Sequence, residues 1–295
     1  MLVTGFGLSV ALATPFDSSG TVADKVMLAH AKRSLDSGCA SVTLFGTTGE
    51  GASIGSQERE RILETSIASG IQPRQIVVGV LVDSAEDAAQ QMSQALSKGV
   101  RNILLAPPSY FKNVSDDGIF AWFADVFARV GSAARDVLVY NIPSVTMVAL
   151  SVDLITRLRK AFPSIVTGVK DSSGDWPYTE ALLRQHGDLI ILIGDERHLA
   201  KGVRMGGQGA ISGMANFAPH EVRAMAVDGN DDPRVERFVA ELLKHPVTPA
   251  VKVMVAKMTG DDTWLAVRPP LTSISADGRR ELVLAFDGLF RTKAA

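Results

Sequence analysis

Short apolar runs alternate along this chain with longer segments in which apolar residues recur at helical spacing. A parallel strand that is buried on both faces is a continuous apolar run, whereas a helix that covers a sheet repeats its apolar positions about every 3.6 residues. Eight such pairs occur in succession. The expected strands are 8–13, 41–45, 75–79, 102–106, 137–141, 165–170, 189–193 and 209–212, and the expected helices are 24–37, 56–69, 84–98, 115–130, 151–160, 176–185, 198–205 and one that starts near 219.

Serine residues mark the starts of several of these helices. A serine hydroxyl at the N-cap accepts a hydrogen bond from a free backbone N–H of the first turn. Ser84, Ser115 and Ser151 have this position, and we expect Ser56 to cap its helix in the same way.

Eight consecutive strand–helix units predict a closed (β/α)₈ TIM barrel, an α/β fold that usually takes about 250 residues. We expect residues 1–227 to form the barrel and residues 228–295 to form a C-terminal helical segment, with helices near 233–243, 249–258 and 277–289. No flexible linker separates the two parts, so the segment is expected to pack on the barrel. An open doubly wound sheet is the competing fold, but the first strand lacks the G-x-G-x-x-G turn of that class.

The composition limits the possible partners. The chain has 295 residues, of which 46% are hydrophobic and 21% charged, and its net charge is −2. No basic field therefore favours nucleic acid or an anionic membrane, and a small polar ligand is the more natural partner. Cys39 is the single cysteine and the five histidines lack zinc-ligand spacing, so we expect no disulfide, no metal site and a reducing cytoplasm.

The N-terminal region is expected to be a first strand and not a signal peptide. The apolar run 8–13 has no basic segment before it and no small-residue cleavage pattern after it. No stretch reaches the roughly 18 uncharged apolar residues that a membrane helix needs.

A lysine lies at the end of the sixth expected strand. The β-branched, apolar run 165–169 leads to Lys170, and a polar turn that contains Gly174 follows it. Burial disfavours the charged ammonium form of a lysine and leaves more of the nucleophilic amine. Taken alone, however, Lys170 is more readily explained as a solvated lysine at a strand end, since most lysines are exposed.

The barrel fold would bring further polar residues to the same rim, because the C-terminal ends of all eight strands meet at one face. Tyr140 lies near the end of the fifth strand, and Thr47 and Thr48 follow the second. The seventh strand leads into Gly194-Asp195-Glu196. An amine in such a pocket can condense with a keto group, and the protonated imine draws electrons from the adjacent carbon. A carbon–carbon bond at that carbon can then be made or broken through an enamine.

The neighbouring residues suit the remaining steps of this chemistry. Tyr140 can move protons between the imine carbon, the leaving alkoxide and water, with Thr47 or Thr48 as a relay. The turn that begins at Gly46 can direct successive backbone N–H groups toward a carboxylate. Each feature also has a purely structural interpretation: the turn can be a tight strand–helix connection, and Asp195-Glu196 can cap the next helix.

Three ordered motifs carry a resemblance to a known family. Gly46-Thr47-Thr48-Gly49-Glu50, Tyr140-Asn141-Ile142-Pro143 and Gly168-Val169-Lys170-Asp171 resemble the dihydrodipicolinate synthase / N-acetylneuraminate lyase family of class I aldolases. The resemblance extends from about residue 13 to residue 271. It implies that Lys170 forms the Schiff base, that Tyr140 relays protons and that Thr47 with Thr48 holds the carboxylate of pyruvate or another 2-oxo acid.

The same resemblance implies an aldehyde as the second partner and no cofactor. Family members are commonly tetramers built from pairs of tight dimers, so a homo-oligomer is expected. We also expect Gly46, Gly194 and Ile211 to line the substrate site. Tyr110 is expected to take the role of the tyrosine that family members lend across the dimer interface.

Some positions depart from the dihydrodipicolinate synthase pattern and bear on the substrate. The synthases have an arginine two residues after the proline of the Tyr-Asn-x-Pro motif, whereas this chain has Val145. The run that follows Lys170 is similar to that of the 2-keto-3-deoxy sugar acid branch. A hydroxylated chain would find hydrogen-bonding partners in Ser172, Ser173, Asp195 and Glu196.

These features predict a pyruvate-type class I aldolase or lyase that acts on a hydroxylated 2-oxo acid. A dihydrodipicolinate synthase that condenses pyruvate with aspartate semialdehyde is the alternative within the family. A barrel that binds a 2-oxo acid without turnover is the alternative of another class. The aldehyde, the direction of the reaction and the choice between cleavage and dehydration stay open.

Overall fold

The computed structural model describes residues 5–290 and forms one parallel sheet in the order β7-β6-β5-β4-β3-β2-β1-β8. The sheet closes into a barrel, because the Gln208 N–H, just before β8, donates to the Ile191 carbonyl of β7 at 2.9 Å. The predicted (β/α)₈ fold is confirmed. The strands are β1 (Gly7–Ala11), β2 (Ser41–Leu44), β3 (Ile76–Val80), β4 (Asn102–Leu105), β5 (Val137–Asn141), β6 (Val166–Asp171), β7 (Ile190–Ile193) and β8 (Gly209–Ser212).

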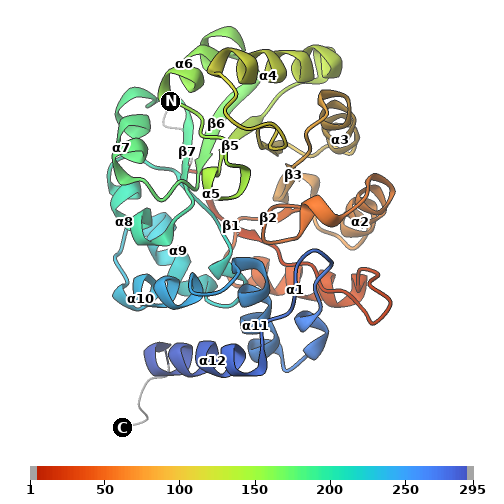
Figure 1. The fold of residues 1–295 in the computed structure, drawn as a ribbon, viewed down its shortest axis with the longest axis vertical. Coiled ribbons are helices and arrows are strands. Elements are labelled where there is room, and N and C mark those ends of the chain that lie inside the picture. The colour runs from red at the N-terminus through yellow and green to blue at the C-terminus, as the bar shows by residue number, and fades with distance from the viewer. Residues whose placement is uncertain (1–4, 291–295) are drawn as a thin grey trace.

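Helices surround the strands in chain order, from α1 at the lower right of Figure 1 through α4 at the top to α8 at the left. A one-turn helix, α5 (Pro143–Thr146), lies between β5 and α6. The barrel helices are α1 (Asp24–Asp36), α2 (Ser56–Ala68), α3 (Ala85–Ser97), α4 (Asp116–Val130), α6 (Val152–Ala161), α7 (Trp176–Gln185), α8 (Glu196–Arg204) and α9 (Pro219–Asp228).

Serine caps open three of these helices as predicted. The hydroxyl groups of Ser84, Ser115 and Ser151 accept hydrogen bonds from backbone N–H groups in the first turns of α3, α4 and α6. The prediction for Ser56 was wrong, because the N-cap of α2 is Gly55, which has no side chain that could accept a hydrogen bond. Gly55 already has the extended backbone of a cap, so Ser56 lies inside the first turn.

Alternation along the strands divides the apolar residues between two cores. On β5, Val139 packs outward against the helices, whereas Leu138 and Tyr140 belong to a smaller cluster inside the barrel. Successive side chains of a strand point to opposite faces. Lys170 pairs in register with Tyr140, so its side chain shares the inner face.

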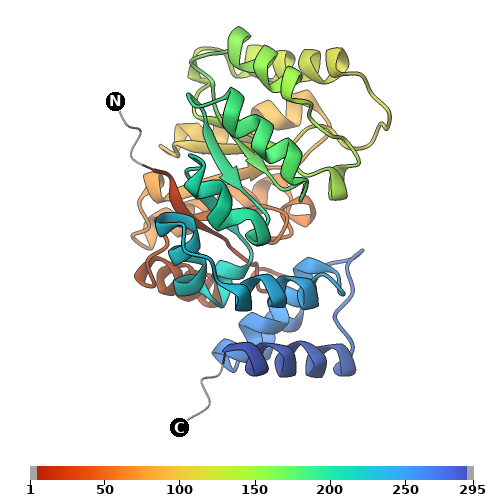
Figure 2. The same ribbon diagram turned by 90° about the vertical axis from the view of Figure 1, so that its left-hand side faces the viewer.

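The C-terminal helices lie together beside the barrel, with α12 farthest from it in both views (Figures 1 and 2). They are α10 (Pro233–Leu242), α11 (Val247–Thr259) and α12 (Ala276–Phe290). Phe238 of α10 and Phe286 of α12 contact Phe217, which follows β8, at ring distances of 5.7 and 5.8 Å. The apolar faces of α10 and α12 are therefore buried against the end of the barrel.

The division into a barrel of residues 1–227 and a segment of residues 228–295 stays a prediction. The proposed boundary falls within the last residues of α9, and residues 1–4 and 291–295 lie outside the described part of the chain. Among the described helices, none is both long and apolar enough to cross a membrane.

Candidate active site

Lys170 and Tyr140 form a contact at the C-terminal ends of β6 and β5. The Lys170 Nζ lies 3.2 Å from the Tyr140 Oη and 4.4 Å from the centre of the tyrosine ring. Both residues are buried, with exposed fractions of 6% and 2%. Both residues lie on strands whose neighbours fix the backbone, and burial limits the movement of their side chains.

A glycine below Lys170 permits this close packing of strands. A Cβ added at Gly168 would lie 2.4 Å from the Ile190 carbonyl oxygen and 2.7 Å from a methyl group of Leu138. Both distances are shorter than any ordinary van der Waals contact. The glycine of the Gly-Val-Lys-Asp motif therefore has a packing role.

The turn between β2 and α2 adds hydroxyl groups to the pair. The Thr47 Oγ1 lies 3.4 Å from the Tyr140 Oη, which extends the contact into a row of lysine, tyrosine and threonine. Thr48 is buried beside it. Gly49 is required where the turn passes β1, because a Cβ there would lie 2.6 Å from the Leu12 carbonyl oxygen.

These residues line a cavity of about 330 Å³ at the barrel rim. Of the predicted substrate residues, Thr47, Thr48, Gly194, Asp195, Glu196, Ser172 and Ile211 all line it together with Tyr140 and Lys170. Gly46 precedes the two threonines but does not line the cavity. The barrel thus brings together side chains from five different strand ends.

The two walls of the cavity differ in character. Ser172, Ser173 and Glu196 form a polar wall on the side of β6 and β7. Val145, Leu243 and Val247 form an apolar wall, to which α10 and α11 contribute. Val145 is the residue at the position of the synthase arginine. Leu243 and Val247 were not predicted, because only helical periodicity was visible in the C-terminal segment.

The carboxylate of Asp195 is hydrogen-bonded at the start of α8. As the N-cap it accepts the Arg197 backbone N–H at 3.0 Å, and the Arg197 guanidinium binds both of its oxygens at 2.9 and 2.6 Å. Burial would raise the pKa of Asp195, but the hydrogen bonds from Arg197 outweigh it and lower the pKa.

The same arrangement occurs at Asp232 and Arg234 at the start of α10, with distances of 3.0 and 2.6 Å. Neither of these two residues lines the cavity. The geometry of Asp195 is therefore that of a helix cap, and Asp195 has little freedom to bind a substrate directly.

Glu196 is free of this pairing and faces the cavity. One of its carboxylate oxygens accepts a hydrogen bond from the Ser212 hydroxyl at 2.5 Å. Burial raises the pKa of Glu196, while the bond from Ser212 and the charge of Lys170 oppose the increase. A raised pKa favours the protonated carboxyl, which can donate as well as accept a hydrogen bond.

Asp171, which directly follows Lys170, points away from the cavity. Its oxygens accept hydrogen bonds from the Asn141 amide at 3.0 Å and from the Thr179 hydroxyl at 2.6 Å. Its backbone is paired in register with Asn141 of β5. Asp171 therefore ties the end of β6 to β5 and α7.

Tyr110 does not reach the cavity of its own chain. It lies on the surface with 76% exposure, next to Phe111 with 71%. Val145 and Met147 are also apolar and exposed, at 57% and 69%. The role predicted for Tyr110 in a neighbouring copy stays a prediction.

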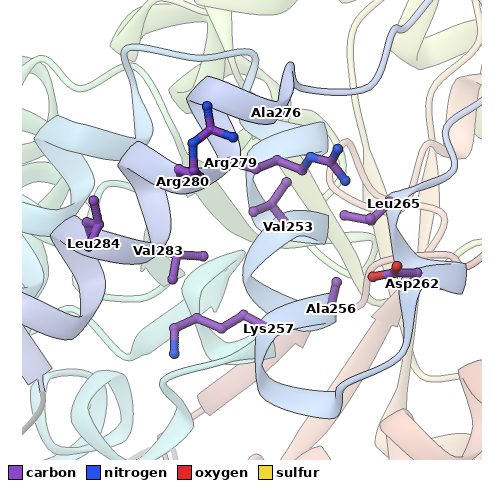
Figure 3. A pocket seen from close by; sticks show the side chains of 10 residues that line it. All are labelled: Val253, Ala256, Lys257, Asp262, Leu265, Ala276, Arg279, Arg280, Val283 and Leu284. Atoms are coloured by element: carbon purple, nitrogen blue, oxygen red, sulfur yellow. The ribbon is translucent and has the colours of Figure 1, made fainter.

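A larger hollow lies elsewhere. A groove of about 590 Å³ lies between α11 and α12. Figure 3 shows its lining, in which aliphatic side chains such as Val253, Val283 and Leu284 predominate. Its one lysine, Lys257, is paired with Asp287 at 2.8 Å. Chemistry rather than volume therefore identifies the barrel rim as the candidate active site.

Comparison with known proteins assigns the class. The model of the dihydrodipicolinate synthetase family matches residues 5–287, which is nearly the whole chain. Members of this family are lyases that form a Schiff base, so the chain is a class I aldolase or lyase of the pyruvate type. It belongs to the dihydrodipicolinate synthetase family.

Individual relatives support this assignment. A DapA-like lyase of Chloroflexus aurantiacus is 31% identical over 289 residues, which is 95% of this chain and 96% of the relative. A 4-hydroxy-tetrahydrodipicolinate synthase of Hyphomonas neptunium is 33% identical over 73% of this chain and 72% of its own length. The crystal structure of a dihydrodipicolinate synthase from Agrobacterium tumefaciens is 67% identical, covers 97% of this chain and 100% of its own, and superposes with a TM-score of 0.96.

Proposed function

We propose that Lys170 forms an imine with a hydroxylated 2-oxo acid and that the enzyme makes or breaks the bond between C3 and C4 of this substrate. The observation that carries the proposal is the 3.2 Å contact of the Lys170 amine with the Tyr140 phenol inside the rim cavity. A nucleophile and its proton carrier within hydrogen-bond reach are the usual arrangement in covalent catalysis.

Tyr140 carries the proton through the first step. The Lys170 amine attacks the C2 carbonyl, and the carbonyl oxygen leaves as water with two protons from the amine and the phenol. The products are a cationic imine and a phenolate, so charge is conserved. The Thr47 hydroxyl, 3.4 Å from the phenol oxygen, is placed to donate to the phenolate.

The same phenolate serves the second step. The phenolate takes the proton of the C4 hydroxyl, and the C3–C4 bond breaks. The electron pair of that bond forms the C2–C3 double bond of an enamine, and the aldehyde leaves. Protonation of C3 and hydrolysis of the imine then release pyruvate and restore the Lys170 amine. In the synthetic direction the same steps run in reverse.

Thr47 and Thr48 are proposed to hold the carboxylate of the 2-oxo acid. Their turn follows β2 directly and borders the cavity beside Tyr140. Hydroxyl groups and successive backbone N–H groups of such a turn suit an anion. A carboxylate held there places C2 next to Lys170.

The polar wall of the cavity favours a hydroxylated chain beyond C3. Ser172 and Ser173 offer hydroxyl groups, and the Glu196 carboxyl, whose pKa is raised by burial, offers oxygens that accept hydrogen bonds. Among the residues that line the cavity, the cationic side chains are those of Lys170 and Arg197. The first is the proposed nucleophile and the second is paired with Asp195. A second substrate carboxylate would therefore lack an unpaired cation.

A dihydrodipicolinate synthase is the second candidate. It is favoured by the relatives of that name, above all by the Agrobacterium tumefaciens protein at 67% identity. The barrel that binds without turnover is the weaker alternative, because binding alone does not need a buried lysine beside a tyrosine. A coupled assay with pyruvate and aspartate semialdehyde measures synthase activity directly.

A homo-oligomer is part of the proposal. Tyr110, Phe111 and Met147 expose apolar surface near the barrel rim, and a second copy of the chain would cover it. Cys39 is the single cysteine and is buried and free, and a chain that cannot form an intrachain disulfide suits a reducing cytoplasm. Sedimentation measurements with Tyr110→Ser test the interface.

The imine is tested by incubation with pyruvate and borohydride followed by intact-mass measurement. We expect a reduced pyruvyl adduct on Lys170 and none in Lys170→Ala. An adduct that persists in Lys170→Ala, or no adduct in the unmodified protein, contradicts the proposal. A panel of 2-keto-3-deoxy acids screened for pyruvate release then identifies the substrate and separates cleavage from dehydration.

A further inference from the structure

A buried ion pair lies directly behind the threonine turn. Glu50, two residues after Thr48, contacts Lys252 of α11, with 2.7 Å between the carboxylate oxygen and the Nζ. Both side chains have an exposed fraction of 0%. The second carboxylate oxygen of Glu50 accepts the Arg268 backbone N–H at 2.9 Å. Residues that follow the barrel thus hold both oxygens of Glu50.

A buried ion pair such as Glu50–Lys252 commonly adds little to the free energy of unfolding. The cost of removing two charges from water is commonly as large as their attraction, and well-packed apolar residues often stabilise as well. Burial lowers the pKa of Lys252, while the carboxylate of Glu50 opposes the decrease. What a buried pair supplies in addition is a fixed geometry, because either partner alone would be left uncompensated.

Arg268 extends the contact to both sides of the turn. Its guanidinium binds the two oxygens of Glu58 on α2 at 2.7 and 2.8 Å and donates to the Ser53 carbonyl at 2.9 Å. The ring of Phe16, from the loop after β1, lies 4.5 Å from both the Lys252 Nζ and the Arg268 Cζ. The cations therefore also secure the β1 loop.

A third contact reaches the threonines themselves. The Thr248 hydroxyl at the start of α11 donates to the Thr47 carbonyl at 3.2 Å. The C-terminal segment consequently touches the turn at Thr47, Glu50 and Ser53. Glu50 has a left-handed backbone with a φ of 56°, a conformation that costs energy for a residue with a side chain and persists where its surroundings impose it.

We infer that Lys252, Thr248 and Arg268 are positioning residues that hold the Thr47-Thr48 turn in the geometry that binds the substrate carboxylate. The C-terminal segment is then part of the carboxylate site and not only a cover for the barrel. This inference rests on the proposed role of the two threonines. It concerns how tightly the 2-oxo acid binds, whereas Lys170 and Tyr140 determine how it reacts.

The test is the pyruvate concentration at which borohydride trapping on Lys170 saturates. The double variant Glu50→Gln/Lys252→Met removes both charges without leaving either one unpaired. We expect half-saturation to rise on the order of tenfold, which corresponds to a weakened hydrogen bond to the carboxylate, with little change in the limiting trapping rate. Unchanged half-saturation in the folded double variant overturns the inference.

Two further variants keep the test decisive. Thr248→Val removes a single hydrogen bond to the turn and should also raise half-saturation, so it replaces the double variant if that one does not fold. Lys257→Met breaks another ion pair of α11, whose lysine does not line the rim cavity, and should leave half-saturation unchanged. A rise in Lys257→Met equal to that of the other variants would indicate a general loss of stability and contradict the inference. Absence of trapping in the unmodified protein would instead refute the proposed function.

Discussion

The Lys170 Nζ lies 3.2 Å from the Tyr140 Oη, and the two residues are direct register partners on β6 and β5. Thirty positions separate them in the chain. The contact is therefore a product of strand pairing: any shift of register by one residue would turn one side chain out of the barrel. The chemistry proposed for this enzyme depends on that register.

Tyr140→Phe removes the phenol oxygen and keeps the ring that packs against Lys170. We expect the rate of pyruvate release to fall about 10²- to 10⁴-fold, the usual contribution of a positioned acid–base group. Steady-state kinetics on the identified 2-oxo acid measure the effect, and prolonged borohydride trapping should still label Lys170. A loss of less than threefold would exclude Tyr140 as the proton carrier.

Glu196→Gln replaces a carboxyl group by an amide of the same shape that can still accept from Ser212. We expect a higher KM for hydroxylated substrates and an unchanged saturation of trapping by pyruvate, since pyruvate has no distal hydroxyl. The two concentration dependences are compared on the same protein preparations. If both shift equally, Glu196 acts on the whole site and not on the distal hydroxyl groups.

Val145→Arg introduces a cation into the apolar wall. Val145 is 57% exposed, so the change should alter the free energy of unfolding by less than about 0.5 kcal/mol. We expect condensation with aspartate semialdehyde to rise and cleavage of a hydroxylated 2-oxo acid with an uncharged distal chain to fall. Val145→Lys is the matched variant, because it adds the charge without the bidentate geometry of arginine.

Gly168→Ala places a methyl group against the Ile190 carbonyl and Leu138. We expect a loss of about 1–3 kcal/mol in the free energy of unfolding, as for other overpacked cores. Gly187→Ala is the control, since a Cβ there meets no atom within 4 Å. Denaturant titration compares the two, and equal stability would show that the strands adjust to the added methyl group.

Acid should weaken the fold through His30. Its Nδ1 accepts from Arg33 at 2.7 Å, so the Nε2–H donates to the Asn216 Oδ1 at 3.0 Å and the ring is neutral. Burial is the main cause that lowers the pKa of His30 from 6.5 to about 4. As the pH falls, His30 is therefore protonated near pH 6.5 in the unfolded chain but only near pH 4 in the folded chain.

The contribution of neutral His30 to the free energy of unfolding is fully present above pH 6.5. It is lost as the pH falls toward 4, at up to about 1.4 kcal/mol per pH unit. Denaturant titrations across this range should show a smaller slope in His30→Gln, although this variant is less stable at pH 7. The exposed His220, changed to Gln, is the control. An identical slope in the His30 variant contradicts the prediction.

Local sequence determined the elements and most of the rim. Apolar runs and helical periods predicted each strand and each helix except the one-turn α5 to within a few residues, and the ends of parallel strands must meet at one face. Lys170, Tyr140, Thr47 and Thr48 could therefore be assigned to one site before any coordinates. The capping serines of α3, α4 and α6 were equally visible, because a cap depends on residues within one turn.

Only the tertiary structure decided what surrounds these residues. The apolar wall from α10 and α11 depends on how distant segments pack, and so does the Glu50–Lys252 pair. Lys252 is separated from Glu50 by 202 positions, and no periodicity records such a contact. The positions of Lys170 and Tyr140 follow from the order of the strands. The shape of the pocket and the support of its threonine turn follow from packing between segments that lie far apart in the chain.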